Sequence, residues 1–201
     1  IGTSYSWYGF PFQFCSTPFY ILPFIIFLPE GKVRNAFLSY ASTFIFFAGF
    51  IVMLIPGDVF VEQIGINIQT MVHHGMQVLL GVYITVWNRK KYHEGFKNLV
   101  NYYWPGLLVF LGMAIIAIIL NEIVHKALPD VTFNMFFISP YFKCTLPILS
   151  NLWEAGLRGF PFTIVYIIGF SFIAALFITF EWIFVVPFTN LIQKISHKKN
   201  A

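Results

Sequence analysis

The chain alternates between long apolar stretches and short polar ones. Five apolar stretches cover residues 10–28, 35–55, 67–87, 99–122 and 162–188. Each is close to the roughly 20 residues that a helix needs to cross the hydrocarbon core of a bilayer. Because the apolar residues follow one another rather than alternating with polar ones, the pattern favours helices over the strands of a membrane barrel. The sequence therefore predicts an all-α, polytopic transmembrane helical bundle of five spans, a single domain over residues 1–201.

The connection between the fourth and fifth stretches, residues 123–161, is long for a loop without structure of its own. Within it, residues 146–157 place four apolar side chains at helical spacing. These are Leu149, Leu152, Trp153 and Leu157. The spacing predicts a short interfacial helix on the outer surface of the membrane.

Composition agrees with a membrane environment. Hydrophobic residues make up 58% of the chain and charged residues 10%, whereas soluble domains have about 25% charged residues. No stretch is polar enough to form a soluble domain. Two cysteines, Cys15 and Cys144, exclude a disulfide-rich scaffold but leave one disulfide open.

The positions of the charges matter more than the net charge of +4. Nine Lys and Arg residues lie in alternate loops and in the tail: Lys32, Arg34, Arg89, Lys90, Lys91, Lys97, Lys194, Lys198 and Lys199. The other side has three, all in the connection: Lys126, Lys143 and Arg158. The positive-inside rule then predicts a multi-pass protein of the cell membrane with its N-terminus outside and its C-terminus in the cytoplasm. The clusters lack interleaved aromatic residues, so we expect no nucleic-acid partner.

Polar residues in the third stretch form a stripe. Members three or four residues apart share one helix face: Asn67, Thr70, His74, Gln77 and Gly81. This face must lie against other helices or water, because lipid would leave its polar groups unsatisfied. His73 lies about 100° around the helix from His74, yet it can approach Gln77.

Three of the stretches place candidate functional side chains at a similar depth in the membrane. Gln13 and Cys15 lie near the outer end of the first stretch, with Cys15 about 7 Å below its start at 1.5 Å per residue. His74 lies about 10 Å below the outer end of the third stretch. The fourth stretch ends on the same side with Asn121 and Glu122. Because intramembrane polar residues are costly and often functional, we expect a polar pocket in the outer half of the bundle.

Other features of the stretches are expected to be structural. Pro18 and Pro23 lie inside the first stretch and are expected to kink its helix. Glu181, next to Trp182, is expected to be interfacial. Three glycines are expected at helix contacts: Gly81, Gly112 and Gly169.

Several short motifs carry a family resemblance. They are Phe-Pro-Phe-Gln-Phe-Cys at 10–15, Ile-Leu-Pro at 21–23, Val-His-His-Gly at 72–75, and Asn121 followed by Phe-Asn-Met-Phe at 133–136. Over most of the chain, in order and spacing, they resemble the YwaF family of bacterial integral membrane proteins. That family has Leu-Pro-Leu-His-Leu-Cys at the first place, so Gln13 replaces a histidine. Family members usually have membrane sequence upstream, and we expect the same before Ile1.

The resemblance implies a chemistry. The family is similar to the eukaryotic transmembrane protein 164, which is regarded as a cysteine-dependent lipid acyltransferase. This implies that Cys15 is a nucleophile, that His74 is its base, and that Asn121 or Asn134 orients the imidazole or donates to an oxyanion. The candidate binding residues are Gln13, Thr70, His73, Gln77, Asn121, Glu122 and Asn134. The substrates would be membrane phospholipids, whose ester bonds lie near the depth of Cys15.

Simpler interpretations remain open. A cysteine in a membrane helix is often a small packing residue, and His74 can hydrogen-bond a neighbouring helix instead of acting as a base. The chain would then be a non-enzymatic membrane subunit with protein partners, or a lipid- or solute-binding module. A metal site from Cys15, His73 or His74, and Glu122 is disfavoured, because no pair of these residues has the helical spacing of ligands. No residue indicates a cofactor.

Overall fold

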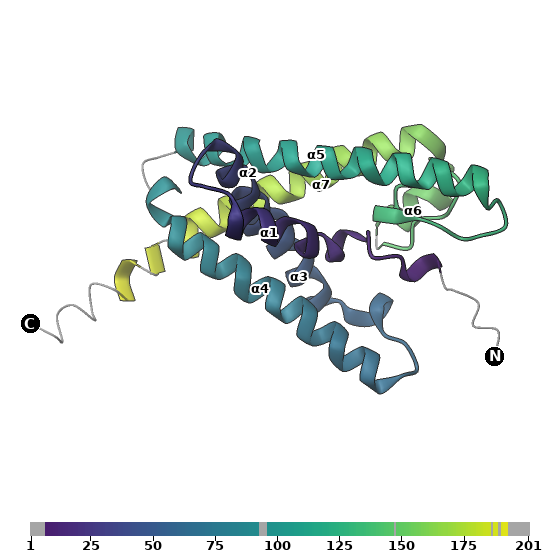
Figure 1. The fold of residues 1–201 in the computed structure, drawn as a ribbon, viewed down its shortest axis with the longest axis horizontal. Coiled ribbons are helices and arrows are strands. Elements are labelled where there is room, and N and C mark those ends of the chain that lie inside the picture. The colour runs from purple at the N-terminus through teal and green to yellow at the C-terminus, as the bar shows by residue number, and fades with distance from the viewer. Residues whose placement is uncertain (1–6, 93–95, 147, 186, 189, 193–201) are drawn as a thin grey trace, which may run out of the picture.

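The computed structural model describes residues 7–92, 96–146, 148–185, 187–188 and 190–192, and these contain helices and no strand. The α-helices are α1 (Pro18–Phe27), α2 (Lys32–Tyr40), α3 (Phe46–Leu54), α4 (Ile64–Tyr92), α5 (Phe96–Ala127), α6 (Leu149–Glu154) and α7 (Gly159–Phe180), as Figure 1 shows. The predicted all-α class is therefore confirmed.

Three helices are long and apolar enough to cross a membrane: Lys32–Leu54, Lys97–Ala127 and Gly159–Phe184. The first joins α2 to α3 through a π-helical turn, Ala41–Ile45, and the third extends α7 through another, Glu181–Val185. They match three of the five predicted spans to within a few residues. The other two, residues 10–28 and 67–87, stay predictions as spans.

The stretch 10–28 is not one helix. Its α-helix begins only at Pro18, after a short 3-10 turn, Phe14–Ser16. Proline suits the first helical position because its missing N–H would have no partner there. Thr17 Oγ1 donates to the Phe14 carbonyl at 2.9 Å, the carbonyl that the missing N–H of Pro18 would otherwise bond. The expectation that Pro18 kinks a continuous helix is therefore wrong. The ten residues of α1 are about 15 Å long, half of a bilayer core.

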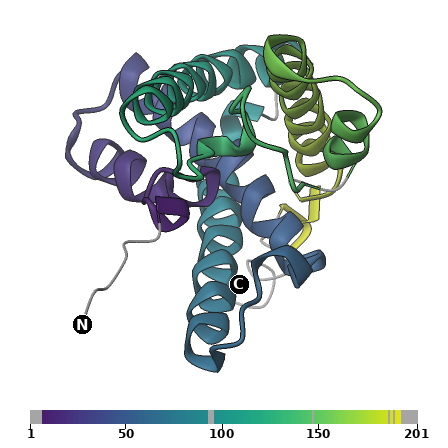
Figure 2. The same ribbon diagram turned by 90° about the vertical axis from the view of Figure 1, so that its right-hand side faces the viewer.

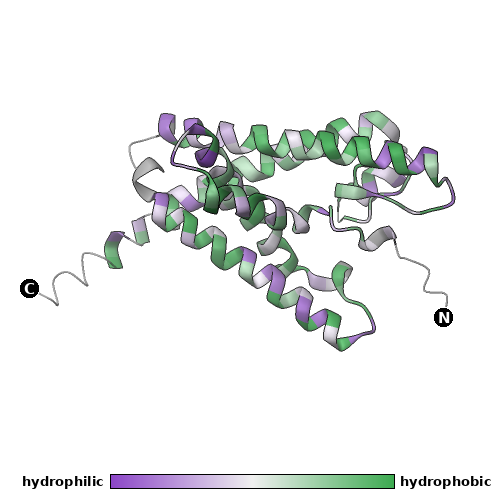
Figure 3. Ribbon diagram, in the orientation of Figure 1, coloured by the Kyte–Doolittle hydropathy of each residue, from purple (hydrophilic) through white to green (hydrophobic). Residues whose placement is uncertain are grey.

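Helix α4 has the length but not the composition of the other three long helices. Its 29 residues extend about 43 Å. Figure 3 shows hydrophilic residues interspersed along α4, whereas α5 and α7 are mainly hydrophobic. In Figure 2 the first half of α4 extends away from the other helices, and Ile64 and Ile68 are exposed there. The polar stripe therefore explains why α4, despite its length, is not among the three helices apolar enough to cross a membrane.

The molecule is elongated and has two ends (Figure 1). Hydrogen bonds place the segment before α1 at one end and the start of α2 at the other. We call the end where α2 and α5 begin the basic end, and the end where α5 stops and α7 begins the loop end. Gln13 Nε2 donates to the carbonyl of Asn134 in the connection after α5, at 3.1 Å. Arg34 Nε donates to the carbonyl of Ile25 at 2.8 Å. The stretch 10–28 therefore runs from the loop end to the basic end.

The long helices alternate in direction between these ends. Thr85, in the second half of α4, donates to the Glu181 carboxylate at 3.2 Å, so α4 and α7 both finish at the basic end. Helix α5 starts at the basic end, beside α2: Ser39 Oγ donates to the Tyr102 carbonyl at 2.5 Å. Helices α2 and α5 therefore run in the same direction, from the basic end toward the loop end.

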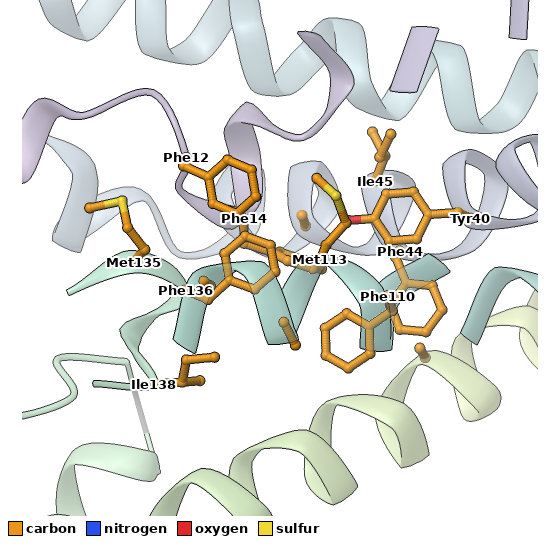
Figure 4. Close-up of a cluster of buried hydrophobic side chains, with 14 of the residues drawn as sticks. Phe12, Phe14, Tyr40, Phe44, Ile45, Phe110, Met113, Met135, Phe136 and Ile138 are labelled. Carbon is orange, nitrogen blue, oxygen red and sulfur yellow. The ribbon is translucent and has the colours of Figure 1, made fainter. Parts of the chain in front are cut away.

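An aromatic core joins these elements (Figure 4). Phe44, in the π-helical turn, stacks on Phe110 of α5 with ring centroids 4.7 Å apart. Phe14 packs edge-on against Phe110 and also against Phe136, in the connection. Phe44, Phe110 and Phe136 are fully buried. The core therefore holds the segment that contains Cys15 against α5 and the connection.

Two expectations about structural residues need correction. Glu181 is not interfacial but fully buried, with Oε1 lacking a hydrogen-bond partner among the described residues. Gly81 packs closely, since an added Cβ would lie 2.2 Å from the Cβ of Phe46. At Gly112 and Gly169 an added Cβ would meet nothing within 4 Å, so these two are not helix contacts.

Candidate functional site

A cavity of about 370 Å³ opens where the segment before α1 meets α4 and α7. Cys15 lines it from the 3-10 turn, and Thr70 and His74 line it from α4. Much of the remaining wall is apolar, with Phe47 and Phe170 among the residues that form it. Residues distant in sequence therefore line one hollow.

His74 is buried, with 3% of its surface exposed. Its Nδ1 lies 2.7 Å from the Thr70 carbonyl oxygen. A carbonyl only accepts, so Nδ1 carries the ring proton of the neutral imidazole and Nε2 carries the lone pair. Nε2 is buried and has no hydrogen-bond partner among the described residues. The ring is thus oriented by its own helix and has a free proton acceptor.

The backbone of Cys15 is attached to α4. Its carbonyl oxygen lies 2.5 Å from Gln77 Nε2 and 2.9 Å from His73 Nε2. The two nitrogens are themselves 2.9 Å apart. A neutral His73 ring can donate from Nε2 to the carbonyl or accept there from Gln77, but not both. In either case the Cys15 backbone is held by two α4 side chains, and both of these lie within one helical turn of His74.

Tyr166 is a cavity residue that the sequence analysis missed. It is fully buried in α7, lines the cavity, and its hydroxyl has no partner among the described residues. A buried tyrosine hydroxyl usually finds a hydrogen-bond partner. The sequence could have indicated Tyr166, because a tyrosine hydroxyl a few residues into an otherwise apolar stretch needs a hydrogen-bond partner. Tyr166 adds a second unpaired polar group to the cavity.

Asn121 does not orient His74, contrary to expectation. It is fully buried, its Oδ1 accepts from the Met135 N–H at 2.8 Å, and its Nδ2 donates to the Met135 carbonyl at 3.1 Å. The side chain therefore satisfies both backbone groups of one residue in the connection. The carbonyl of Thr70 takes the orienting role instead.

Replacing Asn121 by alanine is expected to destabilise the protein by roughly 2–6 kcal/mol. The change leaves two buried backbone groups of Met135 without partners, and each costs about 1–3 kcal/mol. Asn151→Ala, at an exposed position of α6, is the matched control and should leave stability unchanged. Thermal unfolding of the purified protein in detergent measures the difference. Equal unfolding midpoints for the two variants would contradict a stabilising role of the Asn121 hydrogen bonds to Met135.

Gln13 and Asn134 also act on the connection rather than on His74. Gln13 Oε1 accepts from the Phe136 N–H at 3.2 Å, besides the bond from its Nε2 to the Asn134 carbonyl. Asn134 Oδ1 accepts from the Ser139 N–H at 2.9 Å. Phe136 has a φ of 57°, which is uncommon for a residue with a side chain. These amides hold a strained turn, so the proposed role of Asn134 as an orienting group is also wrong.

Glu122 lies outside the cavity. Its carboxylate accepts from the Tyr141 hydroxyl at 2.7 Å and is 3.8 Å from Lys126 Nζ. The hydrogen bond to Glu122 raises the pKa of Tyr141 above its ordinary value. Among the described residues, no three His, Cys, Asp or Glu side chains are grouped to hold a metal ion. Glu122 therefore supports the surface at the loop end.

The two cysteines differ in environment. Both are free, so the disulfide left open by the sequence is absent. Cys15 is half-buried and lines the cavity, whereas Cys144 is fully buried in the connection, where burial raises its pKa to about 11. Of the two cysteines, only Cys15 therefore lines the cavity that His74 also lines.

The cavity is thus lined by three residues that carry a thiol, an unpaired imidazole nitrogen and an unpaired phenol, in largely apolar surroundings. Such a set can form, hold and release an acyl group bound to sulfur. Comparison of the chain with protein-family models, curated proteins and solved structures found no match in any of the three.

Proposed function

We propose that the chain is a multi-pass protein of the cell membrane with five spans, an external N-terminus and a cytoplasmic C-terminus. Two features support the two predicted spans, 10–28 and 67–87, that are not among the three long apolar helices. The stretch 10–28 leads from the loop end to the basic end, and α4 is long enough to cross a bilayer. The connections at the basic end carry Lys32, Arg34 and Lys97, which is typical of a cytoplasmic side.

We further propose that the protein transfers acyl groups between lipids through a thioester on Cys15. The observation that carries this proposal is the unpaired, buried Nε2 of His74, a residue that lines the same cavity as Cys15. Nδ1 is fixed by Thr70, which leaves Nε2 free to act as a base.

The reaction balances with the residues present. His74 Nε2 accepts the thiol proton as Cys15 sulfur attacks the carbonyl carbon of a lipid ester, and the carbonyl electron pair moves onto oxygen. The ester C–O bond then breaks, and the departing lysolipid oxygen takes the proton from Nε2. A second lipid hydroxyl gives its proton to Nε2, attacks the thioester and forms a new ester. The Cys15 thiolate leaves and recovers that proton.

The cavity wall suits an acyl group. Phe47, Phe170 and their apolar neighbours would surround the chain of the substrate and exclude water from the thioester. The Tyr166 hydroxyl is an uncommitted donor for the negative oxygen of the tetrahedral intermediate. Thr70 would keep the imidazole in one tautomer during both proton transfers.

The resemblance to the YwaF family gives further support to this assignment. Two of the residues that carry it, Cys15 and His74, line the same cavity. Gln13, where the family pattern has histidine, uses both ends of its amide on the connection, so a base at this position is not required. The alternative, a lipid-binding module without chemistry, is favoured by the apolar wall alone and predicts no covalent adduct.

The proposal is tested by searching for the covalent intermediate. Membranes containing the protein are incubated with a phospholipid whose acyl chain carries an alkyne tag. We expect a label on Cys15 that hydroxylamine removes, as it removes thioesters, and its loss in Cys15→Ala. Cys144→Ala is the matched control and should keep the label. Equal labelling of Cys15→Ala and the wild type would reject the acyl-transfer proposal, and lipid binding without label would favour the alternative.

A further inference from the structure

A second hollow, remote from Cys15, lies at the basic end. It is a groove of about 780 Å³ between α2 and α5, which we call the α2–α5 groove. Its lining changes along its length. Lys32, Asn35, Asn98 and Asn101 come from the first turns of the two helices, whereas Leu108 and Val109 lie further along α5.

Because α2 and α5 run in the same direction, the order of the lining residues makes the polarity of the groove change along its length. Helices α2 and α5 run side by side away from the basic end, with Ser39 of α2 bonded to the Tyr102 carbonyl of α5. Asn98 and Leu108 are ten residues apart in one helix, hence separated by about 15 Å. The groove is therefore polar at the end of the molecule and apolar toward its middle.

The charge at the polar mouth is positive. Glu30 is the nearby acid, and it is already 3.7 Å from Arg34. Lys32 is exposed and has no ion pair among the described residues. Lys97 precedes Asn98 and is also exposed. An anion at the mouth would therefore meet a lysine whose charge no carboxylate of the described residues compensates.

The groove also offers a hydrogen-bond acceptor. Pro105 lines it and has no N–H, so the Asn101 carbonyl one turn earlier loses its usual helical donor. The amide side chains of Asn98 and Asn101 add donors and acceptors. The mouth is thus suited to a group that has negative oxygens together with hydroxyl donors.

We propose that the α2–α5 groove binds an anionic phospholipid, with the phosphate at Lys32, a hydroxylated headgroup at the amides, and one acyl chain along Leu108 and Val109. Basic pockets between transmembrane helices at the membrane surface are a recurrent form of lipid recognition. This site does not depend on the chemistry at Cys15. It shares no lining residue with the Cys15 cavity.

The test is native mass spectrometry of the purified full chain in mild detergent, titrated with phosphatidylglycerol or phosphatidylcholine of identical acyl chains. We expect tighter binding of phosphatidylglycerol. Lys32→Gln should weaken it about fivefold, which corresponds to about 1 kcal/mol per basic residue, and leave phosphatidylcholine unchanged. Ala36→Trp, which fills the groove, should weaken both lipids.

Lys126→Gln is the matched control, because it removes the same charge from the opposite end of α5. It should leave both affinities unchanged. The proposal fails if the wild type binds the two lipids equally, or if Lys126→Gln weakens phosphatidylglycerol as much as Lys32→Gln does. It also fails if the soluble headgroup glycerophosphoglycerol competes as well as the whole lipid, since the apolar part of the groove would then contribute nothing.

Discussion

Replacing His74 by alanine is expected to slow formation of the Cys15 thioester by about 10²–10⁴-fold, the usual contribution of a positioned general base. The nucleophile is the thiolate, and the cavity around Cys15 contains no other imidazole with an unpaired nitrogen among the described residues. The neighbouring His73 is engaged with the Cys15 carbonyl and Gln77. The protein without His74 therefore has no substitute base at the thiol.

The measurement is the initial rate at which the tagged acyl chain is transferred to Cys15. A purely structural role for His74 would also lower this rate, so the decisive readout is rescue. Added imidazole should restore part of the activity of His74→Ala, because the deletion leaves room in the cavity for a small base. His125→Ala, whose ring stacks on Tyr141 at the loop end, should retain the wild-type rate. A slow variant with a native melting temperature that imidazole does not rescue would argue against a catalytic base.

The helical elements were largely predictable because lipid imposes simple rules. A long apolar run must satisfy its backbone internally, so it forms a helix. Stretch 99–122 accordingly lies within α5, and most of stretch 162–188 lies in α7 and the π-helical turn that follows it. The stretch 10–28 was harder, since a hydropathy pattern does not reveal that Pro18 begins a helix rather than kinking one. Its first eight residues are held by contacts to the distant connection, and such contacts leave no periodic signal.

The sequence predicted a depth in the membrane for Cys15 and His74, but not which side chains surround them. Periodicity placed His74 on the polar face of α4, and the rise of a helix set it level with Cys15. Which groups surround them depends on tertiary packing. Asn121 reaches Met135 rather than His74, and Tyr166 enters the cavity from α7. Glu181 was misplaced for a similar reason, because α4 supplies Thr85 as a partner that allows its burial.

The same packing makes α4 the element on which the site depends. Through His73 and Gln77 it holds the backbone of Cys15, and through His74 it supplies the base. Its own position rests on close contact with α3, where an added Cβ at Gly49 would lie 2.7 Å from the His74 carbonyl oxygen. A change that separates α3 from α4 should therefore affect stability and the cavity together.

Gly81→Ala is expected to have the largest effect on stability among conservative helix substitutions. The new Cβ would lie 2.2 Å from Phe46 Cβ and 2.4 Å from its Cγ. Neither atom can move far without the backbone of α3, and the Phe46 ring is confined edge-on against Phe177 at 4.8 Å. The two helices must separate, at a cost of about 1–3 kcal/mol or more. The gain in helix propensity over glycine, about 1 kcal/mol, offsets only part of this.

Gly112→Ala supplies the matched comparison, because the same change in α5 meets nothing within 4 Å. It keeps the gain in propensity without the clash, so its stability should equal or exceed that of the wild type. Thermal unfolding in detergent should rank Gly112→Ala, wild type and Gly81→Ala in descending order. Labelling of Cys15 should fall in Gly81→Ala alone, since a displaced α4 carries His74 away from the thiol. Equal stability of the two variants would mean that α3 and α4 are not in close contact at Phe46, and the position of His74 beside Cys15 would lose its support.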